Sequence, residues 1–432
     1  AGFYANTVNQ KFTFDATDKL SFYARGGYYD NKTRRPYEAY DYNILHETFN
    51  YGIGAQYMIN KGNYITADCY ADHFSSSYCF FKDNKTYNGK AGEEQVRKRT
   101  RNHNLSIKGI FKLGNRHKLS VGTEYIVDVL KSQTDNIAKE DAYTLALFAQ
   151  DEIKLLRNLQ ALIGVRYIYH ENFKNHATPN VALMYKPGKF NFRASYAAGF
   201  RTPTLSELYA TDIAKKNDRL TIGNLDLKPE KNNYFSLSAE YVHERFSVSV
   251  NAFYNNIRDM IDYNTIATGD KAMEQYGHKE VRQRDNIAEA KVHGINVSAN
   301  AYLGAGFNLS GGYTHLNTQD VELEQPIDKS IKNAYNINAQ WAHSWKIYRL
   351  NINLNGRFNS KRFSKSYGYA PEYQLWDLNT RHSFNLKSVI IEPGCGMENL
   401  FDYMDDRPYN SNYATLTPGR SFYISLSLKF KS

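Results

Sequence analysis

The most constraining feature of this sequence is an alternation of apolar and polar residues that recurs along most of the chain. Near the C-terminus, Phe422, Ile424, Leu426, Leu428 and Phe430 alternate with Ser421, Ser425, Ser427 and Lys429, and segments 246–251 and 350–355 repeat the pattern. Side chains in a strand point alternately to its two faces, so each segment has one apolar and one polar face. One such strand is ordinary, but many predict an all-β fold, a transmembrane antiparallel β-barrel. We expect Leu350, Ile352, Leu354, Ile424, Leu426 and Leu428 to face lipid, and Asn351, Asn353, Ser425 and Ser427 to face the lumen.

The composition is compatible with a barrel and excludes a helical membrane protein. No apolar run approaches the 20 or so residues that a membrane-spanning helix needs. A barrel needs no such run, because its strands intersperse lipid-facing apolar residues with polar residues of the lumen. The 36 Tyr and 24 Phe fit the aromatic girdles found where a barrel meets the lipid headgroups. The alternative fold is an aromatic-rich soluble β-sandwich or propeller.

The net charge of +10 is spread over the chain, and its densest cluster is Arg97-Lys98-Arg99-Thr100-Arg101. No zinc-finger spacing, RNP-like motif or basic helix accompanies this segment, so we do not expect nucleic-acid binding. A solvated strand end or a contact with acidic lipid headgroups is the preferred interpretation. A basic lumen would also attract an anionic substrate.

The chain carries no motif of an enzyme, cofactor site or metal site. It lacks a nucleophile elbow, a His-Glu-x-x-His motif and a phosphate loop. Its three cysteines have no metal or redox spacing, although Cys69 and Cys79 are close enough in sequence to pair across a bend, which would leave Cys395 unpaired. We therefore expect no catalysis, no cofactor and no structural metal.

Turn residues divide the chain into about 19 strands whose connections alternate between short and long. Short connections are expected at 60–63, 113–116, 186–189, 243–245 and 303–306, and long ones at 76–96, 199–226, 264–280, 319–329 and 404–417. Outer-membrane barrels have short periplasmic turns and longer extracellular loops in this order. The long loops are therefore assigned to the cell exterior, where binding residues tend to lie.

Several segments resemble those of TonB-dependent outer-membrane receptors, the 22-stranded plugged transporters of Gram-negative bacteria. They are HKLSVGTEY at 117–125, FAQDE at 148–152, GVRY at 164–167, GFRTPTLSELY at 199–209, NLDLKPEK at 224–231, NLFD at 399–402 and PGR at 418–420. Their order and spacing across roughly residues 100–432 are similar to those of the family. The resemblance implies an active transporter in the cell outer membrane that binds a scarce, bulky nutrient. It also implies an N-terminal plug pulled by the TonB complex.

The resemblance leaves the ligand open among a ferric siderophore, cobalamin and haem, in descending order of expectation. In haem receptors a histidine usually lies between the two loop motifs, and residues 204–222 contain none. Tyr209 can ligate haem iron, and so could His170, His176 or His278, although a lone loop histidine is usually only solvated. The alternative function is a passive porin-like or adhesion barrel.

The candidate ligand contacts lie in or beside the two loops 199–226 and 264–280. They are Arg201, Tyr209, Lys215, Lys216, Arg219, Tyr276 and His278. Arg201 could also hold its loop or the plug through carboxylates, because arginine presents five donors in a rigid fork.

Residues 1–432 are interpreted as one domain, the barrel without its plug. Counting back from a C-terminal strand that ends in the periplasm places the strand near Tyr4 with its first residue outside the cell. Because single-chain outer-membrane barrels have an even number of strands, we expect about three strands and the plug to be supplied by a missing N-terminal fragment or a second chain.

Overall fold

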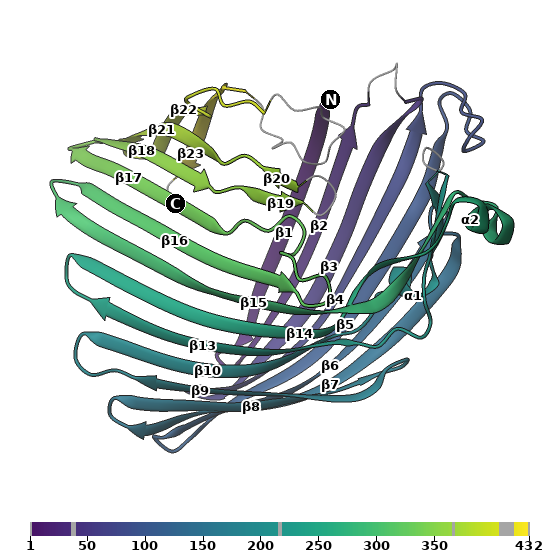
Figure 1. Ribbon diagram of the computed structural model, residues 1–432. Helices are drawn as coiled ribbons and strands as arrows, with labels where there is room; N and C mark the ends of the chain where they lie inside the picture. Colours follow the sequence, from purple (N-terminus) through teal and green to yellow (C-terminus); the bar gives the residue numbers. More distant parts are fainter. Residues whose placement is uncertain (1, 36–39, 215–217, 365–367, 406–418, 431–432) are drawn as a thin grey trace. The chain divides into compact units, whose positions relative to one another are not determined.

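The computed structural model describes residues 2–35, 40–214, 218–364, 368–405 and 419–430, and it is almost entirely β-structure (Figure 1). These residues form 23 strands and two short helices; 21 of the strands belong to one sheet, and β19 pairs with β20 in a separate small sheet. Neither helix of this described part is long and apolar enough to cross a membrane.

The chain divides into two compact units, residues 1–181, 197–232 and 258–288 in the first, and residues 182–196, 233–257 and 289–432 in the second. Elements confined to the first unit are β1 (Phe3–Thr17), β2 (Leu20–Thr33), β3 (Tyr42–Asn60), β4 (Asn63–Phe80), β5 (Glu94–Leu113), β6 (His117–Ser132), β7 (Ile137–Leu156), β8 (Leu159–His170), α1 (Leu205–Tyr209), β11 (Thr211–Ala214), β12 (Arg219–Ile222) and α2 (Gly269–Tyr276). Elements confined to the second are β16 (Phe307–Asp320), β17 (Asn333–Trp345), β18 (Tyr348–Asn359), β19 (Arg362–Ser364), β20 (Gly368–Ala370), β21 (Tyr373–Asn385), β22 (Val389–Glu398) and β23 (Ser421–Phe430). Five strands run through both, β9 (Lys174–Tyr185), β10 (Phe190–Arg201), β13 (Glu230–Val242), β14 (Phe246–Thr268) and β15 (Glu280–Gly304).

The number of long strands agrees with the sequence. Of the 23 strands among the described residues, β11, β12, β19 and β20 have only three or four residues each, which leaves 19 long ones. Successive long strands pair in antiparallel register from β1 to β8 and from β15 to β23. Short turns lie where the sequence predicts them, for example at Gly62 and Gly114, whose positive φ values of 94° and 63° suit glycine.

The two predicted strand faces are present in β17 and β18. The Asn338 amide donates to Asn353 Oδ1 at 2.6 Å and Asn355 Oδ1 at 2.5 Å, and the Gln340 amide donates to Asn351 at 3.2 Å. Leu350, Ile352 and Leu354 alternate with these asparagines and so occupy the opposite face. In β23 all residues from Phe422 to Phe430 are exposed, Ile424 to 89% and Leu426 to 66%, so exposure does not separate the two faces of that strand. The amide hydrogen bonds between β17 and β18 confirm a polar face there, opposite the apolar residues.

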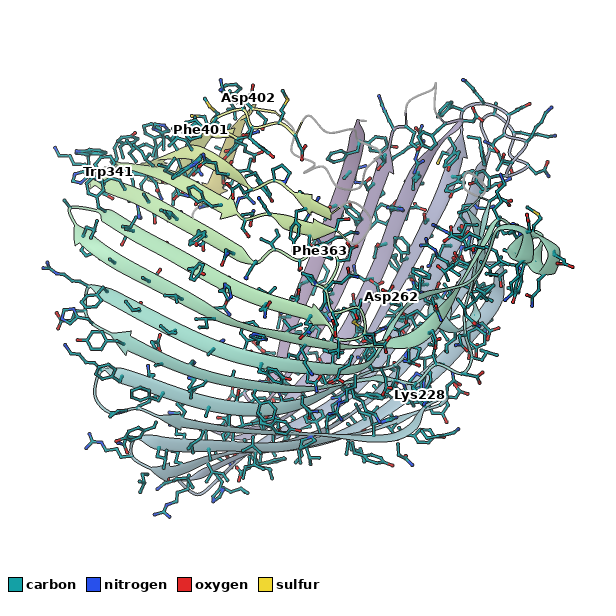
Figure 2. All side chains as sticks on the ribbon, in the orientation of Figure 1. Lys228, Asp262, Trp341, Phe363, Phe401 and Asp402 are labelled. Carbon is teal, nitrogen blue, oxygen red and sulfur yellow. The ribbon has the colours of Figure 1, made fainter. Side chains whose placement is uncertain are left out.

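Aromatic side chains gather at the short turn between β17 and β18. Trp341, labelled in Figure 2, lies 6.0 Å from His343 and 6.0 Å from Phe307, measured between ring centroids. Trp345 stacks on Tyr348 across the turn at 5.5 Å. Such a cluster at one end of alternating strands has the composition of an interfacial girdle.

One prediction about local structure was wrong. Cys69 and Cys79 lie ten residues apart on the single strand β4, about 33 Å at 3.3 Å per residue, and both are free. They cannot form a disulfide, because the chain does not bend between them. The long connections expected at 199–226 and 264–280 are present and contain short elements: α1, β11 and β12 in the first, and the end of β14 and α2 in the second.

The outermost strands are paired in register with their neighbours, β1 with β2 and β23 with β22. These pairings do not test the expectation that further strands and a plug complete the barrel. That expectation stays a prediction.

Candidate functional site in the loops of the first unit

The first structured loop begins where β10 ends at Arg201, and its conformation is set by a capping box. Pro203 precedes Thr204, whose hydroxyl accepts a hydrogen bond from the Glu207 N–H at 3.2 Å. Glu207 Oε2 in turn accepts from the Thr204 N–H at 2.8 Å. These reciprocal bonds satisfy two N–H groups at the start of α1, so a five-residue helix can form here.

Arg201 holds α1 to β13, the long strand that begins at Glu230. Its guanidinium donates to Glu230 Oε2 at 2.7 Å and Oε1 at 2.5 Å, and to Glu207 Oε2 at 3.0 Å. Burial acts to raise the pKa of Glu207, but hydrogen bonds from Arg201 and Thr204 outweigh it and hold that pKa below its usual value. The Arg201 clamp, meaning Arg201 with Glu207 and Glu230, thus joins β10, α1 and β13.

Two small apolar clusters pack against α1 and hold it in place. Leu205 packs with Leu130, Ile137 and Ala142, and Leu208 packs with Leu227 and Ile261. Tyr209 contacts both clusters, and burial raises the pKa of its hydroxyl.

The segment 224–231 is tied to β15 by one amide side chain. Asn286 Nδ2 donates to the carbonyl of Lys228 (labelled in Figure 2) at 2.8 Å and to that of Asp259 at 2.7 Å. Asn286 Oδ1 accepts from the Lys228 N–H at 2.7 Å. The motif at 224–231 therefore has a structural function here, fixing the chain as it re-enters the sheet.

A short hairpin, β11 with β12, lies against β15 in an arrangement that sequence patterns do not reveal. β12 pairs with the start of β15 in parallel, from Arg219 opposite Glu280 to Ile222 opposite Gln283. Apolar contacts support this pairing, since Leu220 and Ile222 pack against Ala267, Ala272 and Val281. The hairpin is therefore held in place by both backbone and side-chain contacts.

The tip of the hairpin is fastened to the segment after α2. His278 Nδ1 lies 2.9 Å from Asp218 Oδ1, and the Lys279 N–H donates to the Asp218 carbonyl at 3.0 Å. Gly277 ends α2 in the left-handed conformation with φ 71°, and Tyr276 packs on the cluster beneath the hairpin.

A pocket of about 150 Å³ lies between this hairpin, α1 and β15, and we call it the arginine pocket. Its lining includes Arg219, Arg282 and Arg284 together with Tyr263, Ser206, Asp135 and Asp212. The Arg284 guanidinium lies 3.5 Å from the centroid of the Tyr263 ring and donates to its hydroxyl at 2.6 Å. Arg282 pairs with Glu280 at 2.5 Å.

One polar atom of the arginine pocket lacks a hydrogen-bond partner in the described part of the chain, and one carboxyl of the pocket has a raised pKa. Arg219 Nε is buried and has no hydrogen-bond partner within the described residues. Burial, together with the charge of Asp135, raises the pKa of Asp212 against the opposing effect of Arg219. The pocket therefore has three guanidinium groups and two carboxyls in its lining, an excess of positive charge that favours binding of an anionic group.

Comparison with known proteins agrees with this architecture. A family model for the β-barrel of TonB-dependent receptor-like proteins matches residues 1–399. The chain belongs to the TonB-dependent receptor β-barrel family. Barrels of this family lie in the outer membrane of Gram-negative bacteria, and the family is one of receptors and transporters rather than enzymes.

Solved structures with a similar fold include two receptors and an iron transporter. The chain matches a variant of the ferric enterobactin receptor PfeA from Pseudomonas aeruginosa with a TM-score of 0.81 and 17% identity, over 99% of this chain and 70% of that one. It matches the siderophore receptor PirA from the same organism with a TM-score of 0.75 and 16% identity, over 100% and 71% of the two chains. It matches the iron transporter FrpB from Neisseria meningitidis with a TM-score of 0.74 and 13% identity, over 99% and 71%. At these identities the likeness establishes the fold.

In this TonB-dependent receptor barrel the candidate residues from the sequence do not form one cluster. Arg219 lines the arginine pocket, Arg201 belongs to the clamp, Tyr209 lies between two apolar clusters, and Tyr276 and His278 lie by the tip of the hairpin. Lys215 and Lys216 lie outside the described residues.

The histidines considered as haem ligands are engaged in other contacts. His170 is buried and accepts from the Asn172 N–H at 3.1 Å, and His176 stacks on Phe200 at 4.0 Å. Within the described residues no three His, Cys, Asp or Glu side chains are grouped to hold a metal ion.

Sequence reasoning missed Arg282, Arg284 and Tyr263, which line the arginine pocket with Arg219. The signal that was present is the spacing Arg282-Gln283-Arg284, which places two arginines on one face of a strand. The parallel pairing with β12 is what brings Arg219 beside them.

Proposed function

We propose that this chain is the barrel of an outer-membrane active transporter that binds an anionic metal chelate at its extracellular loops and imports it with TonB-supplied energy. A ferric siderophore is the favoured ligand, ahead of cobalamin and haem. Support comes from the family and from solved neighbours described as siderophore receptors and iron transporters. In this proposal residues 1–432 form the barrel, and the TonB complex acts through a plug of the kind the family carries.

The observation that carries the proposal is the arginine pocket. Three guanidinium groups converge from β12 and β15, and one of them has an unpartnered buried Nε among the described residues. A space of about 150 Å³ suits one anionic group of a larger ligand rather than a whole chelate. Arginine binds carboxylate and catecholate-like oxygens through its planar fork, and such charge-assisted bonds are stronger than neutral ones.

Replacing Arg219 and Arg284 together with glutamine should weaken binding of a ferric siderophore about 10- to 100-fold, the size expected for losing one or two charged hydrogen bonds. Calorimetric titration of the purified receptor with ferric enterobactin, haem and cyanocobalamin would measure this and rank the three ligands. Arg166→Gln is the matched control, because Arg166 of β8 pairs with Glu124 of β6, two strands away, and neither residue lines the pocket. Unchanged affinity in the double variant would contradict the assignment of the pocket.

The other contacts proposed from sequence, Arg201, Tyr209, Lys215, Lys216, Tyr276 and His278, lie in or beside the two loops and are proposed to act with the pocket. Removing hairpin 211–222 and helix 269–276 together should abolish uptake while the barrel still assembles in the outer membrane. Uptake that survives this deletion would move the site elsewhere, most simply to the plug.

Active transport is distinguished from a passive porin-like or adhesion barrel by its energy requirement. Accumulation of the radiolabelled iron chelate should stop when the proton gradient of the cell is collapsed, while binding at the surface continues. Uptake that persists at an undiminished rate would favour the passive alternative.

A further inference from the structure

The basic segment at the start of β5 presents part of its charge on the outer face of the sheet. In β5 the exposed side chains at alternate positions are Arg99, Arg101, His103, Leu105 and Ile107. No register shift interrupts the pairing of β5 with β6, so the period of two holds along the whole run. Arg99 and Arg101 therefore share a face with Leu105 and Ile107, which are 49% and 46% exposed.

The opposite face of β5 is the polar one. Asn102 Nδ2 donates to Asp128 Oδ1 at 2.8 Å, and Lys98 Nζ lies 3.4 Å from Asp135. In a membrane barrel the polar face lines the interior, so the face of Leu105 and Ile107 meets lipid. The arginines on that face point away from any ligand in the pore.

These basic residues lie just beyond the height of an apolar membrane band. Arg101 is twelve residues from Leu113 at the short-turn end of β5, and Lys131 is fourteen residues from His117 on β6. At about 3.4 Å per residue and a tilt of about 40°, they stand about 30 to 35 Å above the short turns, whereas the apolar band of such barrels is about 25 Å tall. That is the level of the outer-leaflet headgroups.

The charges at this level are not neutralised by the protein. Arg99 and Lys131 are directly opposite each other in the β5–β6 ladder, where like charges repel and destabilise the pair. Within the part of the chain that the structure describes, Arg99, Arg101 and Lys131 form no ion pair or hydrogen bond with a side chain. An anion between them would relieve the repulsion.

The acidic residues of the same face are engaged elsewhere. Glu47 accepts from the Tyr28 hydroxyl at 3.0 Å and from Ser75 at 3.4 Å, and Asp141 pairs with Lys139 at 3.0 Å. Glu47 on β3 is two strands away from Arg99, because Ser75 of β4 lies between them in the register. Asp141 on β7 is likewise two strands away from Arg101, with Val129 of β6 between them. The acidic groups thus flank the basic group without pairing with it.

The neighbouring Arg97 has a hydrogen-bond donor without an acceptor among the residues that the structure describes, which is independent of the repulsion between Arg99 and Lys131. Arg97 lies over the rings of Tyr78 and Tyr87, at 5.3 and 5.1 Å from their centroids, and its buried Nε has no hydrogen-bond partner in the described residues. Arg97, Arg99 and Lys131 also line one depression of about 630 Å³ at the loop end of these strands, together with Lys98 and one carboxylate, Glu93. Glu93 accepts hydrogen bonds from the Lys90 N–H and from Gln95.

We propose that Arg99, Arg101 and Lys131 bind a phosphate group of an outer-leaflet glycolipid whose acyl chains lie against the apolar face of β5 and β6. Charge complementarity and the continuity of the basic residues with the lipid-facing residues Leu105 and Ile107 favour a lipid over a soluble anion. Arginine and lysine near a membrane surface are the usual ligands of anionic headgroups.

The test uses the full-length receptor in phosphatidylcholine nanodiscs doped with bisphosphorylated lipid A, and native mass spectrometry counts the lipid A that each protein retains. The triple variant Arg99→Gln, Arg101→Gln and Lys131→Gln should lower the apparent affinity by about fivefold per residue, on the order of a hundredfold in all. The control triple Lys61→Gln, Arg116→Gln and Arg157→Gln makes the same charge change in exposed short turns and should bind as the wild type does.

Three outcomes would overturn the proposal. They are wild-type retention by the triple variant, an equal loss in the control, and equal binding of dephosphorylated lipid A. Displacement of lipid A by millimolar inorganic phosphate or by a ferric chelate would assign Arg99, Arg101 and Lys131 to binding of a soluble anion instead. If the triple variant fails to show the heat-modifiable gel migration of a folded barrel, the single variants Arg99→Gln and Arg101→Gln decide, each with an expected fivefold loss.

Discussion

Replacing Leu426 with arginine should destabilise the folded barrel in a bilayer by about 2–4 kcal/mol, the penalty for a cation on the lipid face near the membrane centre. Leu426 lies on the apolar face of β23 between Ile424 and Leu428, which are 89% and 51% exposed. It is four residues from Phe430, about 10 Å in height on a strand tilted by 40°, so it lies close to the middle of a band about 25 Å tall. Equilibrium unfolding in lipid vesicles with guanidinium would measure the loss.

Ser427→Arg is the matched control, because Ser427 is the next residue of the same strand and faces the polar side. Its register partner is Glu392, which already pairs with Lys429 at 2.6 Å. We expect this substitution to change stability by less than about 1 kcal/mol, the range of a solvated charge. Equal losses at the two positions would mean that the apolar face of β23 does not meet lipid.

The sequence predicted the strand faces and most short turns because both are encoded locally. A period of two survives in any strand, so the assignment of Asn351 and Ile352 to opposite faces needs no knowledge of tertiary structure. The amide hydrogen bonds between β17 and β18 confirm it, since they join the polar face that Asn351 and Asn353 share. Glycines such as Gly62 and Gly114 mark turns because their φ values are positive.

The site was less predictable because long-range contacts assemble it. Arg219 meets Arg282 and Arg284 only through a parallel pairing between segments about 60 residues apart in sequence, which no periodicity signals. Arg201 was expected either to contact the ligand or to hold its loop or the plug through carboxylates, and it is engaged by Glu207 and Glu230. A basic residue in a loop motif thus serves to hold the loop here.

Arg201→Ala should release α1 from β13 and destabilise the loop by about 1–3 kcal/mol. Glu207 and Glu230 have side chains only 14% and 16% exposed, so removing the guanidinium leaves two poorly solvated carboxylates facing each other. This loss of stability is smaller than the 3–5 kcal/mol of a fully buried pair, because Arg201 itself is 42% exposed. Hydrogen exchange of the amides of residues 204–210 should accelerate accordingly, with those of β18 unchanged.

The lowered pKa of Glu207 gives this prediction a pH signature. A carboxyl whose pKa is lower in the folded state than in the unfolded state stabilises the fold fully at pH values above its unfolded pKa of about 4.3. This contribution is lost as the pH falls through the folded-state pKa. The protection factors of residues 204–210, which compare each amide with its intrinsic exchange rate at the same pH, should therefore fall in the wild type in strongly acidic buffer. In Arg201→Ala they should rise instead, because acid neutralises the two stranded carboxylates. Adding Glu207→Gln and Glu230→Gln to Arg201→Ala removes the stranded charges and should restore part of the protection. Exchange rates that are unaffected by Arg201→Ala at neutral pH would show that the apolar contacts of Leu205 and Leu208 alone hold the helix.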